Sequence, residues 1–245
     1  SLYFKVPISL AIGASIISVI ATSSGAASAY VRDKISNIRV GTFLVLFTTS
    51  GAIAGAFLEP VAPARIIYLT FGTVLLISII PLIMKLGEKV PKNVKNAPLA
   101  EKLSLNSHFY DSESGKELDY NVTGIKSGSA MMLVAGILSG LLGIGSGVFK
   151  VIAMDTFMRL PIKVSTTTSN FMIGMTAAAS AGIYLFRGEV NPFIAAPVAI
   201  GVLVGAMVGS RILMKIRGNT VRIIFAIIIV AVAVEMLLNG VGIRV

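Results

Sequence analysis

The sequence nearly repeats itself at an interval of 154 residues, as from Pro7 to Pro161. Residues 5–55 and 159–209 align without a gap. The matched pairs include Ser15 with Ser169, Tyr30 with Tyr184, Asn37 with Asn191, Gly51 with Gly205 and Gly55 with Gly209. An internal repeat in a very apolar chain is typical of secondary transporters, which are built from two related halves around a shared site. The repeat therefore predicts two related structural halves.

The composition excludes a water-soluble domain. Hydrophobic residues make up 55% and charged residues 13% of the 245 residues, and the mean hydropathy is +0.89. A soluble domain carries about 25% charged residues. We therefore expect an all-α integral membrane protein in the cell membrane. The net charge of +10 then indicates cytoplasmic loops rich in Lys and Arg, and no nucleic-acid partner is expected.

No enzyme or cofactor signature is present in the sequence. There is no cysteine, and the single histidine, His108, lies in a polar stretch. This excludes a disulfide, a thiolate nucleophile and a histidine metal cluster. No Walker loop ending in Gly-Lys-Ser/Thr occurs, so the chain is not expected to hydrolyse ATP. We expect a protein that is not an enzyme and that needs no cofactor or metal.

Six apolar segments are long enough to cross a bilayer, whose hydrocarbon core takes about 20 helical residues. The expected spans are 8–30, 40–59, 64–84, 163–186, 192–213 and 220–239. A polar inter-repeat loop, 86–126, divides the chain into a first transmembrane half, 1–85, and a second, 127–245. We expect this loop to be a solvated cytoplasmic linker, and a regulatory or partner-binding loop is the alternative.

A further apolar element, residues 127–158, is interrupted by glycines. The glycines are Gly136, Gly140, Gly143, Gly145 and Gly147. Each one weakens a continuous helix by up to about 1 kcal/mol. The element is either one tilted helix with a kink, or a re-entrant pair of half-helices that meet at LLGIGSG and leave on the side they entered.

The distribution of Lys and Arg among the short loops favours the re-entrant pair. With a single crossing, these residues divide seven to five between the two sides. With a re-entrant pair they divide eight to four: Arg32, Lys34, Arg39, Arg159, Lys163, Lys215, Arg217 and Arg222 against Lys5, Arg65, Arg187 and Arg244. Three spans and a hairpin in each half would invert the second repeat relative to the first, as alternating access favours.

The repeat interval also indicates that the first half lacks a hairpin. The counterpart of residues 127–158 would lie before Ser1. We expect either that the natural protein continues upstream with a second glycine-rich hairpin, or that it works with an incomplete first half.

Three groups of residues could bind an anion. A helix broken in mid-membrane exposes backbone N–H groups with positive partial charge, and Gly143, Gly145 and Gly147 would allow close approach to them. Lys150 follows three residues later, and a charge inside an apolar element is a functional candidate by default. Hydroxyl and amide side chains form the third group: Thr168, Ser169 and Asn170, with Ser15 and Ser23 in the first half.

Each group also has a structural interpretation. The glycines could serve close helix packing. Hydroxyls could bond to the carbonyl four residues earlier, and Lys150 could pair with Asp155 or extend to the membrane surface. A stripe of small residues on one helix face, Gly201, Gly205 and Gly209, indicates helix packing.

Four segments together resemble the sulfite exporter TauE/SafE family of anion permeases. They are GILSGLLGIGSGVF, LPIKVSTTTSNFM, AGIYLFRGEVN and GVLVGAMVGSRIL, and their order and spacing fit that family's half-repeat. The second half matches throughout, and the first matches more loosely from Lys5 to about Gly55. The resemblance implies a secondary transporter that exports or exchanges a small sulfur-containing anion, such as sulfite or an organosulfonate, by alternating access.

The resemblance also implies partners and site residues. The three glycines Gly143, Gly145 and Gly147 would line the substrate region, with Thr168 and Ser169 opposite. The partners would be the anion, the lipid bilayer and a coupling ion, either a proton or sodium. Lys150 stands where members of the family usually have an apolar residue. The alternatives are a membrane scaffold that does not transport, in which the polar residues only bond helices together, and a passive anion channel.

Overall fold

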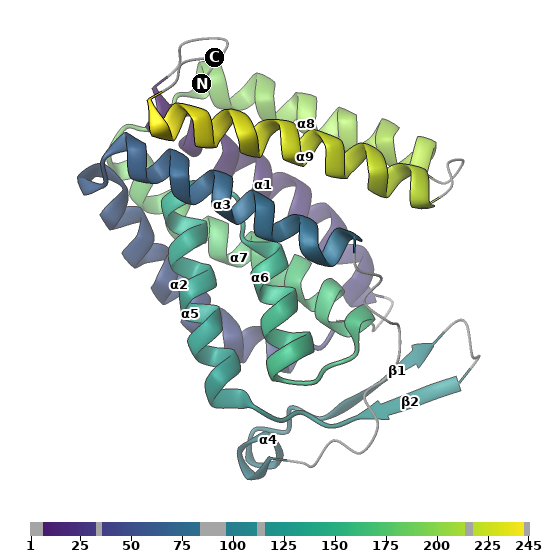
Figure 1. Cartoon of the computed structure of the whole chain (residues 1–245). Coiled ribbons are helices and arrows are strands. Elements are labelled where there is room, and N and C mark those ends of the chain that lie inside the picture. Colours follow the sequence, from purple (N-terminus) through teal and green to yellow (C-terminus); the bar gives the residue numbers. More distant parts are fainter. Residues whose placement is uncertain (1–6, 33–35, 84–96, 112–115, 214–217, 243–245) are drawn as a thin grey trace.

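Long helices occupy the six ranges in which the sequence predicts spans (Figure 1). The computed structural model describes residues 7–32, 36–83, 97–111, 116–213 and 218–242. The first half contains α1 (Ile8–Arg32), α2 (Ile38–Leu58) with the 3₁₀ turn η1 (Glu59–Val61), and α3 (Ala64–Ile83). The second half contains α7 (Ile162–Phe186), α8 (Pro192–Leu213) and α9 (Gly218–Val241). The prediction of a mainly helical fold is confirmed.

Several of these helices carry the apolar surface that a membrane requires. Within the described residues, Ile38–Val61 and Ile125–Leu142 are long and apolar enough to cross a bilayer. Shorter apolar helical segments are Ile8–Ser24, Ala64–Ile77, Pro192–Gly205 and Ala226–Val241. Large apolar side chains such as Phe186 and Phe193 are almost fully exposed, which suits contact with lipid and not with water.

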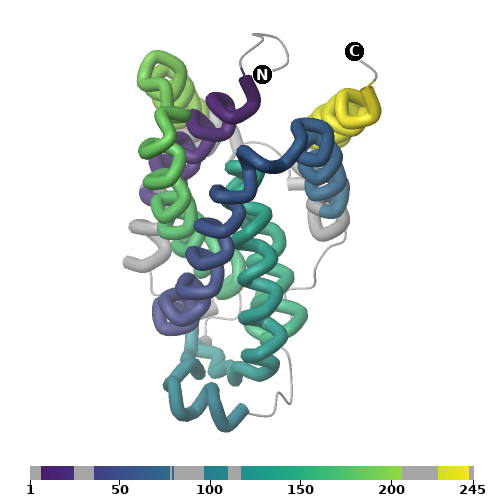
Figure 2. Tube along the Cα trace, turned by 90° about the vertical axis from the view of Figure 1, so that its left-hand side faces the viewer, coloured from purple at the N-terminus to yellow at the C-terminus, as the bar shows by residue number. Residues whose placement is uncertain are grey.

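The contacts among these six helices are symmetric between the two halves. Helix α1 packs on α7 and α3 packs on α9, while α2 contacts α7 as α8 contacts α1. Exchanging the first three helices with the last three leaves this pattern unchanged. Figure 2 shows α3 with α9 on one side of the molecule and α1 with α8 on the other. The inverted orientation of the halves in a membrane stays a prediction.

The glycine-rich element folds as two helices that double back. Helix α5 (Ile125–Leu142) is followed by α6 (Gly147–Ile152) and the π-helical turn η2 (Ala153–Phe157). The N–H of Thr123, just before α5, donates to the carbonyl of Met158, just after η2, at 3.2 Å. The chain thus returns to the end at which α5 begins. Its re-entrant placement in a membrane stays a prediction.

A glycine in the left-handed conformation ends α5. Gly143 has φ +68° and its N–H donates to the Ser139 carbonyl at 2.9 Å, which is a common way to close a helix. Gly145 has φ +70°, and Ser146 also lies in this region with φ +45°. A residue with a Cβ rarely adopts this conformation. The chain therefore breaks between Gly143 and Ser146.

Helices α2 and α5 pack with their backbones in contact. A Cβ on Gly51 would lie 2.3 Å from the Leu133 carbonyl oxygen, and one on Gly136 would lie 2.2 Å from the Thr48 carbonyl oxygen. Gly55, one turn further along α2, is as close to α5. Small residues at this spacing let two apolar helices approach closely. This contact fixes the glycine-rich pair to the first half.

The segment between the halves is folded, which corrects the expectation of a solvated linker for residues 97–124. It contains α4 (Pro98–Lys102) and an antiparallel hairpin of β1 (Ser107–Asp111) and β2 (Lys116–Tyr120). We call residues 97–111 and 116–124 the cap; Figure 1 shows it at one end of the helices. Residues 84–96 and 112–115 lie outside the described residues.

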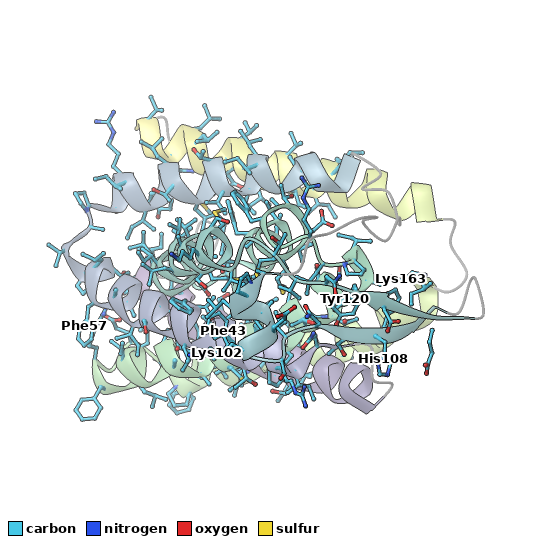
Figure 3. All side chains as sticks on the ribbon, turned by 90° about the horizontal axis from the view of Figure 1, so that it is seen from below. Phe43, Phe57, Lys102, His108, Tyr120 and Lys163 are labelled. Atoms are coloured by element: carbon cyan, nitrogen blue, oxygen red, sulfur yellow. The ribbon has the colours of Figure 1, made fainter. Side chains whose placement is uncertain are left out.

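Apolar side chains of the cap explain why it does not stay in solvent. Leu105 is 1% and Val122 0% exposed, and both join a core with side chains of α2, α5 and α7. The polar residues around them dominate the composition and conceal this pattern. Figure 3, seen from the cap end, shows His108 and Tyr120 on the hairpin; His108 is exposed and Tyr120 is buried.

Asn37 ties the cap to the helices. Its Oδ1 accepts the Val40 N–H and caps α2, and its Nδ2 donates to the Leu105 carbonyl at 2.9 Å and to the Tyr120 hydroxyl at 2.8 Å. Its own backbone N–H donates to Thr168 Oγ1 at 3.0 Å. Burial raises the pKa of the Tyr120 phenol above its ordinary value, so the hydroxyl stays neutral. One side chain thus joins the cap, α2 and α7.

The glycine contact predicts a difference between two repeat-related substitutions. Gly51→Ala should lower stability by about 1–3 kcal/mol, because the added methyl group meets backbone that cannot move aside. At Gly205, the matched position in α8, an added Cβ would meet none of the described residues within 4 Å. Gly205→Ala should leave stability unchanged or raise it by up to about 1 kcal/mol through helix propensity. The fraction of each variant that stays monodisperse after heating in detergent measures its stability. Equal losses of stability in the two variants would contradict the packing described.

Candidate functional site

The break between α5 and α6 lies between two repeat-related residues. A Cβ on Gly145 would lie 3.0 Å from Ile173 Cγ2 of α7 and 3.3 Å from Val19 Cγ1 of α1. Val19 and Ile173 are separated by the repeat interval. Two matched positions of the two halves therefore enclose the glycine at the centre of the break.

Serines at another matched pair of positions hold the backbone of the break. Ser15 Oγ donates to the Gly143 carbonyl at 2.9 Å, and Ser169 Oγ donates to the Gly147 carbonyl at 3.1 Å. A hydroxyl has one proton to donate. In this conformation both protons are used on the break, so these serines position its backbone and do not donate to a ligand.

The end of α7 is fastened to α5 and α2. The Tyr184 hydroxyl donates to the Gly140 carbonyl at 2.7 Å, in the last turn of α5. Arg187, which follows α7, forms ion pairs with Glu59 and Glu189. Glu59 is buried, so this contact is more than a loose surface pair. It joins the end of α7 to the end of α2, on the side away from the cap.

Lys150 is fully buried and its ammonium group points back to the break. Its Nζ donates to the Gly145 carbonyl at 3.1 Å and to Thr176 Oγ1 at 3.0 Å. Thr176 Oγ1 of α7 lies 3.0 Å from Thr48 Oγ1 of α2. The lysine therefore connects the glycine-rich pair to one helix from each half.

The charge of Lys150 has no acidic partner within the part of the chain that the structure describes. The pairing with Asp155 that the sequence left open is absent. An ammonium group has three N–H bonds, and neutral oxygens accept two of them. Burying an uncompensated charge costs several kcal/mol. Such a charge inside an apolar protein marks a functional position.

Ser146 supplies a second unused polar group at the break. It precedes the first residue of α6, is 3% exposed, and its Oγ finds no hydrogen-bond partner among the described residues. The N–H of Lys150 donates to the Ser146 carbonyl at 3.2 Å, so the backbones of the two residues lie one helical turn apart. Among the described residues, a hydroxyl without a partner and an ammonium proton without an acceptor thus belong to residues at the same break.

Three residues that the sequence suggested for the site make no hydrogen bond to the break among the described residues. Thr168 Oγ1 accepts the Asn37 N–H beside the cap. Ser23 Oγ donates to the Val19 carbonyl of its own helix at 2.6 Å. Asn170 is half-buried and makes no hydrogen bond within the described ranges. The structure gathers the others around the break: Gly143, Gly145, Gly147, Lys150, Ser15 and Ser169.

Sequence reasoning missed four residues that shape this site. Ser146 lies inside the motif LLGIGSG, which was interpreted only through its glycines. Thr176 lies two helical turns after Ser169 on the same helix face, a signal that could have found it. Thr48 gave no local signal, because it joins the site only through the packing of α2. The match of Tyr184 with Tyr30 marked its position but not its role.

Comparisons with known proteins find one matching family and two similar proteins. The model of the family described as Sulfite exporter TauE/SafE matches residues 1–236. Probable membrane transporter protein YunE of Bacillus subtilis (strain 168) is 24% identical over 232 residues, which are 95% of this chain and 82% of that protein. Probable membrane transporter protein YdhB of the same organism is 28% identical over 213 residues, which are 86% of this chain and 77% of that protein. No solved structure matches the chain.

Proposed function

The chain belongs to the sulfite exporter TauE/SafE family of membrane transporters, and from this premise we propose that it carries a small sulfur-containing anion across the cell membrane. The observation that carries the proposal is the buried Lys150 ammonium, which has no acidic partner among the described residues and lies at the break of the glycine-rich pair. An anion bound there compensates the charge. The substrate class is sulfite or an organosulfonate.

The free donors at the break suit a compact oxyanion. The third N–H of Lys150 and the hydroxyl of Ser146 lie one turn apart and are both unused. The three oxygens of a sulfite or sulfonate group carry delocalised negative charge and can accept both donors at once. Glycines at 143, 145 and 147 place no side chain of their own between the backbone and the anion.

The remaining polar contacts hold this donor pair in place. Thr176 and Thr48 fix the ammonium group from α7 and α2. Ser15 and Ser169 fix the break from α1 and α7. Preorganised donors lose little entropy when the ligand binds. We assign anion binding to Lys150 and Ser146, and positioning to the serines and threonines.

The site is closed in this conformation. Lys150 is 0%, Ser146 3% and Ser169 2% exposed. Single hydroxyl–carbonyl bonds connect α1 and α7 to the break, and each such bond contributes about 1 kcal/mol. Breaking the Ser15 bond frees one wall of the site, and breaking the Ser169 bond frees the other. Alternating access follows if the two bonds open in turn.

Basic residues favour a cytoplasmic position for the cap end of a multi-pass protein. Exposed basic side chains at this end include Arg39, Lys102, Lys126 and Arg159. Figure 3 shows Lys102 and Lys163 there as well. Lys and Arg concentrate in the cytoplasmic loops of membrane proteins. The cap then lies inside the cell, as the sequence predicts for the polar loop.

Transport by the purified protein in proteoliposomes tests the proposal. Labelled sulfite should enter vesicles preloaded with sulfite in a saturable way, and a sulfonate should compete while the uncharged dimethyl sulfone should not. Flux that does not saturate would identify a channel. No flux of any of these anions would favour the scaffold and would contradict transport.

Replacing the buried ammonium should weaken sulfite binding without unfolding the protein. Lys150→Met removes a charge-assisted hydrogen bond worth about 1.5–3 kcal/mol, so the apparent affinity for sulfite should fall about 10- to 100-fold. Its stability should change little, because relief of the buried charge offsets the hydrogen bond that the Gly145 carbonyl loses. Lys126→Met, at an exposed lysine of α5, is the control. Unchanged affinity in Lys150→Met would remove this residue from the site.

Ser146 allows stability and affinity to be separated. Ser146→Gly relieves the positive φ and should stabilise the protein by about 1 kcal/mol, while the loss of the hydroxyl should raise the half-saturating sulfite concentration. Ser146→Ala removes the same hydroxyl and keeps the strain. The two variants should therefore share the weaker affinity and differ in melting temperature. Wild-type affinity in both would contradict a role for the hydroxyl.

A further inference from the structure

Lys150 makes two hydrogen bonds among the described residues, and its own N–H groups donate both. The Gly145 carbonyl, 3.1 Å from Nζ, can only accept. The Thr176 hydroxyl lies 3.0 Å from Nζ and donates to the Met172 carbonyl at 2.7 Å. A hydroxyl has one proton to donate, so Thr176 accepts from the lysine. The described part of the chain therefore offers Lys150 two acceptors.

Two acceptors complete the hydrogen bonds of a neutral amine and leave an ammonium group one short. A neutral amine has two N–H bonds and one lone pair, whereas an ammonium group has three N–H bonds. Lys150 is 0% exposed, so bulk water does not supply the third acceptor. A buried lysine gives up its charge readily when nothing compensates it. The groups around Lys150 thus suit the amine, and an anion is needed to suit the ammonium.

The elements packed around Lys150 supply little negative charge. Helix α6 packs on α3, α5, α7 and η2, and α1 and α2 reach the break through Val19 and Thr48. The ionisable residues of these elements are Tyr30, Arg32, Arg39, Arg65, Tyr68, Lys126, Asp155, Lys163 and Tyr184. The one carboxylate in this set, Asp155, is half-buried and does not bond to Lys150. Proton uptake by Lys150 is therefore compensated only when an anion binds.

A sodium ion is poorly suited to this place. Transporters that carry sodium hold it with unwound backbone carbonyls. Here the carbonyls at 143, 145 and 147 accept hydrogen bonds from two serines and from Lys150. Within the described ranges, no three acidic or histidine side chains are gathered where they could hold a metal ion. The cation that the break can bind is a proton on the lysine nitrogen.

We propose that Lys150 binds the proton that is transported together with the anion, and that the protein is a one-to-one symporter of protons and anions. This inference rests on the proposed function. As the anion enters, the lone pair of the amine takes a proton from water on the side to which the site is open. The third N–H of the resulting ammonium donates to an oxygen of the anion. On the other side the anion leaves and the proton returns to water.

The coupling follows from the cost of a buried charge. Without the anion, the amine of Lys150 is neutral. With a monovalent anion, the ammonium and the anion together have no net charge. An anion without the proton, or a proton without the anion, would leave an uncompensated charge inside the protein, which is costly. The direction of net transport then follows the sum of the anion and proton gradients.

Net uptake into proteoliposomes measures this coupling. Labelled methanesulfonate is the probe, because it stays a monovalent anion at every pH used, so any effect of pH comes from the protein. The pH dye pyranine inside the vesicles should report one proton per anion taken up. An interior that is one pH unit more alkaline than the outside should accumulate the anion up to about tenfold. Replacing sodium with choline, or imposing a potassium diffusion potential with valinomycin, should not change this accumulation.

Lys150→Arg separates the charge from the proton. A guanidinium group stays protonated in proteins. The variant should therefore still exchange internal for external methanesulfonate but should lose the net uptake driven by pH. As pH is lowered, the half-saturating concentration of the wild type should fall by up to about tenfold per unit, and that of Lys150→Arg should not change. Lys126→Arg, at an exposed lysine of α5, is the control and should behave as the wild type. If Lys150→Arg does not fold, the proton count of the wild type decides.

The outcomes distinguish this inference from the proposed function. Methanesulfonate exchange without proton movement, or uptake that follows the membrane potential, would overturn the inference and leave the proposed function standing. Uptake that requires sodium, or coupling that survives in Lys150→Arg, would also overturn it. If methanesulfonate is not exchanged at all, the inference is overturned, and the exchange of sulfite, measured separately, decides the proposed function alone.

Discussion

The structure depends on how peptide groups are satisfied where the chain breaks inside an apolar environment. A break between two helices leaves carbonyl and N–H groups without partners, and lipid offers none. Here the carbonyls at the break accept hydrogen bonds from Ser15, Ser169, Tyr184 and Lys150. Each donor comes from a different place in the sequence. The need to satisfy the break therefore determines how α1, α6 and α7 are arranged around it.

Close glycine packing makes this arrangement rigid on one side and leaves it open on the other. Gly51 and Gly136 bring α2 and α5 together, backbone on backbone, and Thr48 is thereby placed beside Thr176 and the ammonium of Lys150. Helix α8 carries the matched residues, but within the described part of the chain nothing packs on Gly201 or Gly205. The half with the packed glycines is the one that supports the proposed site.

The sequence predicted what depends on length, apolarity and the repeat, and missed what depends on distant packing. The six helices follow from apolar length, and Ser15 with Ser169 follows from the repeat interval. Thr168 was expected to contact the substrate, and its hydrogen bond to the Asn37 N–H could not be predicted because Asn37 lies 131 residues away. The cap was expected in solvent, because its sequence is mostly polar and its few apolar residues, such as Leu105, form no recognisable pattern. The pairing of Lys150 with Asp155, which the sequence left open, is absent among the described residues, since the lysine side chain points toward the break.

The location of a bound anion tests the central claim most directly. Selenite is the heavier analogue of sulfite, and its selenium can be located by anomalous diffraction from crystals of the protein soaked at saturating concentration. The account predicts one ordered selenium position within hydrogen-bonding reach of both Lys150 Nζ and Ser146 Oγ. An ordered anion at another place in the protein, or an empty break at saturation, would contradict it.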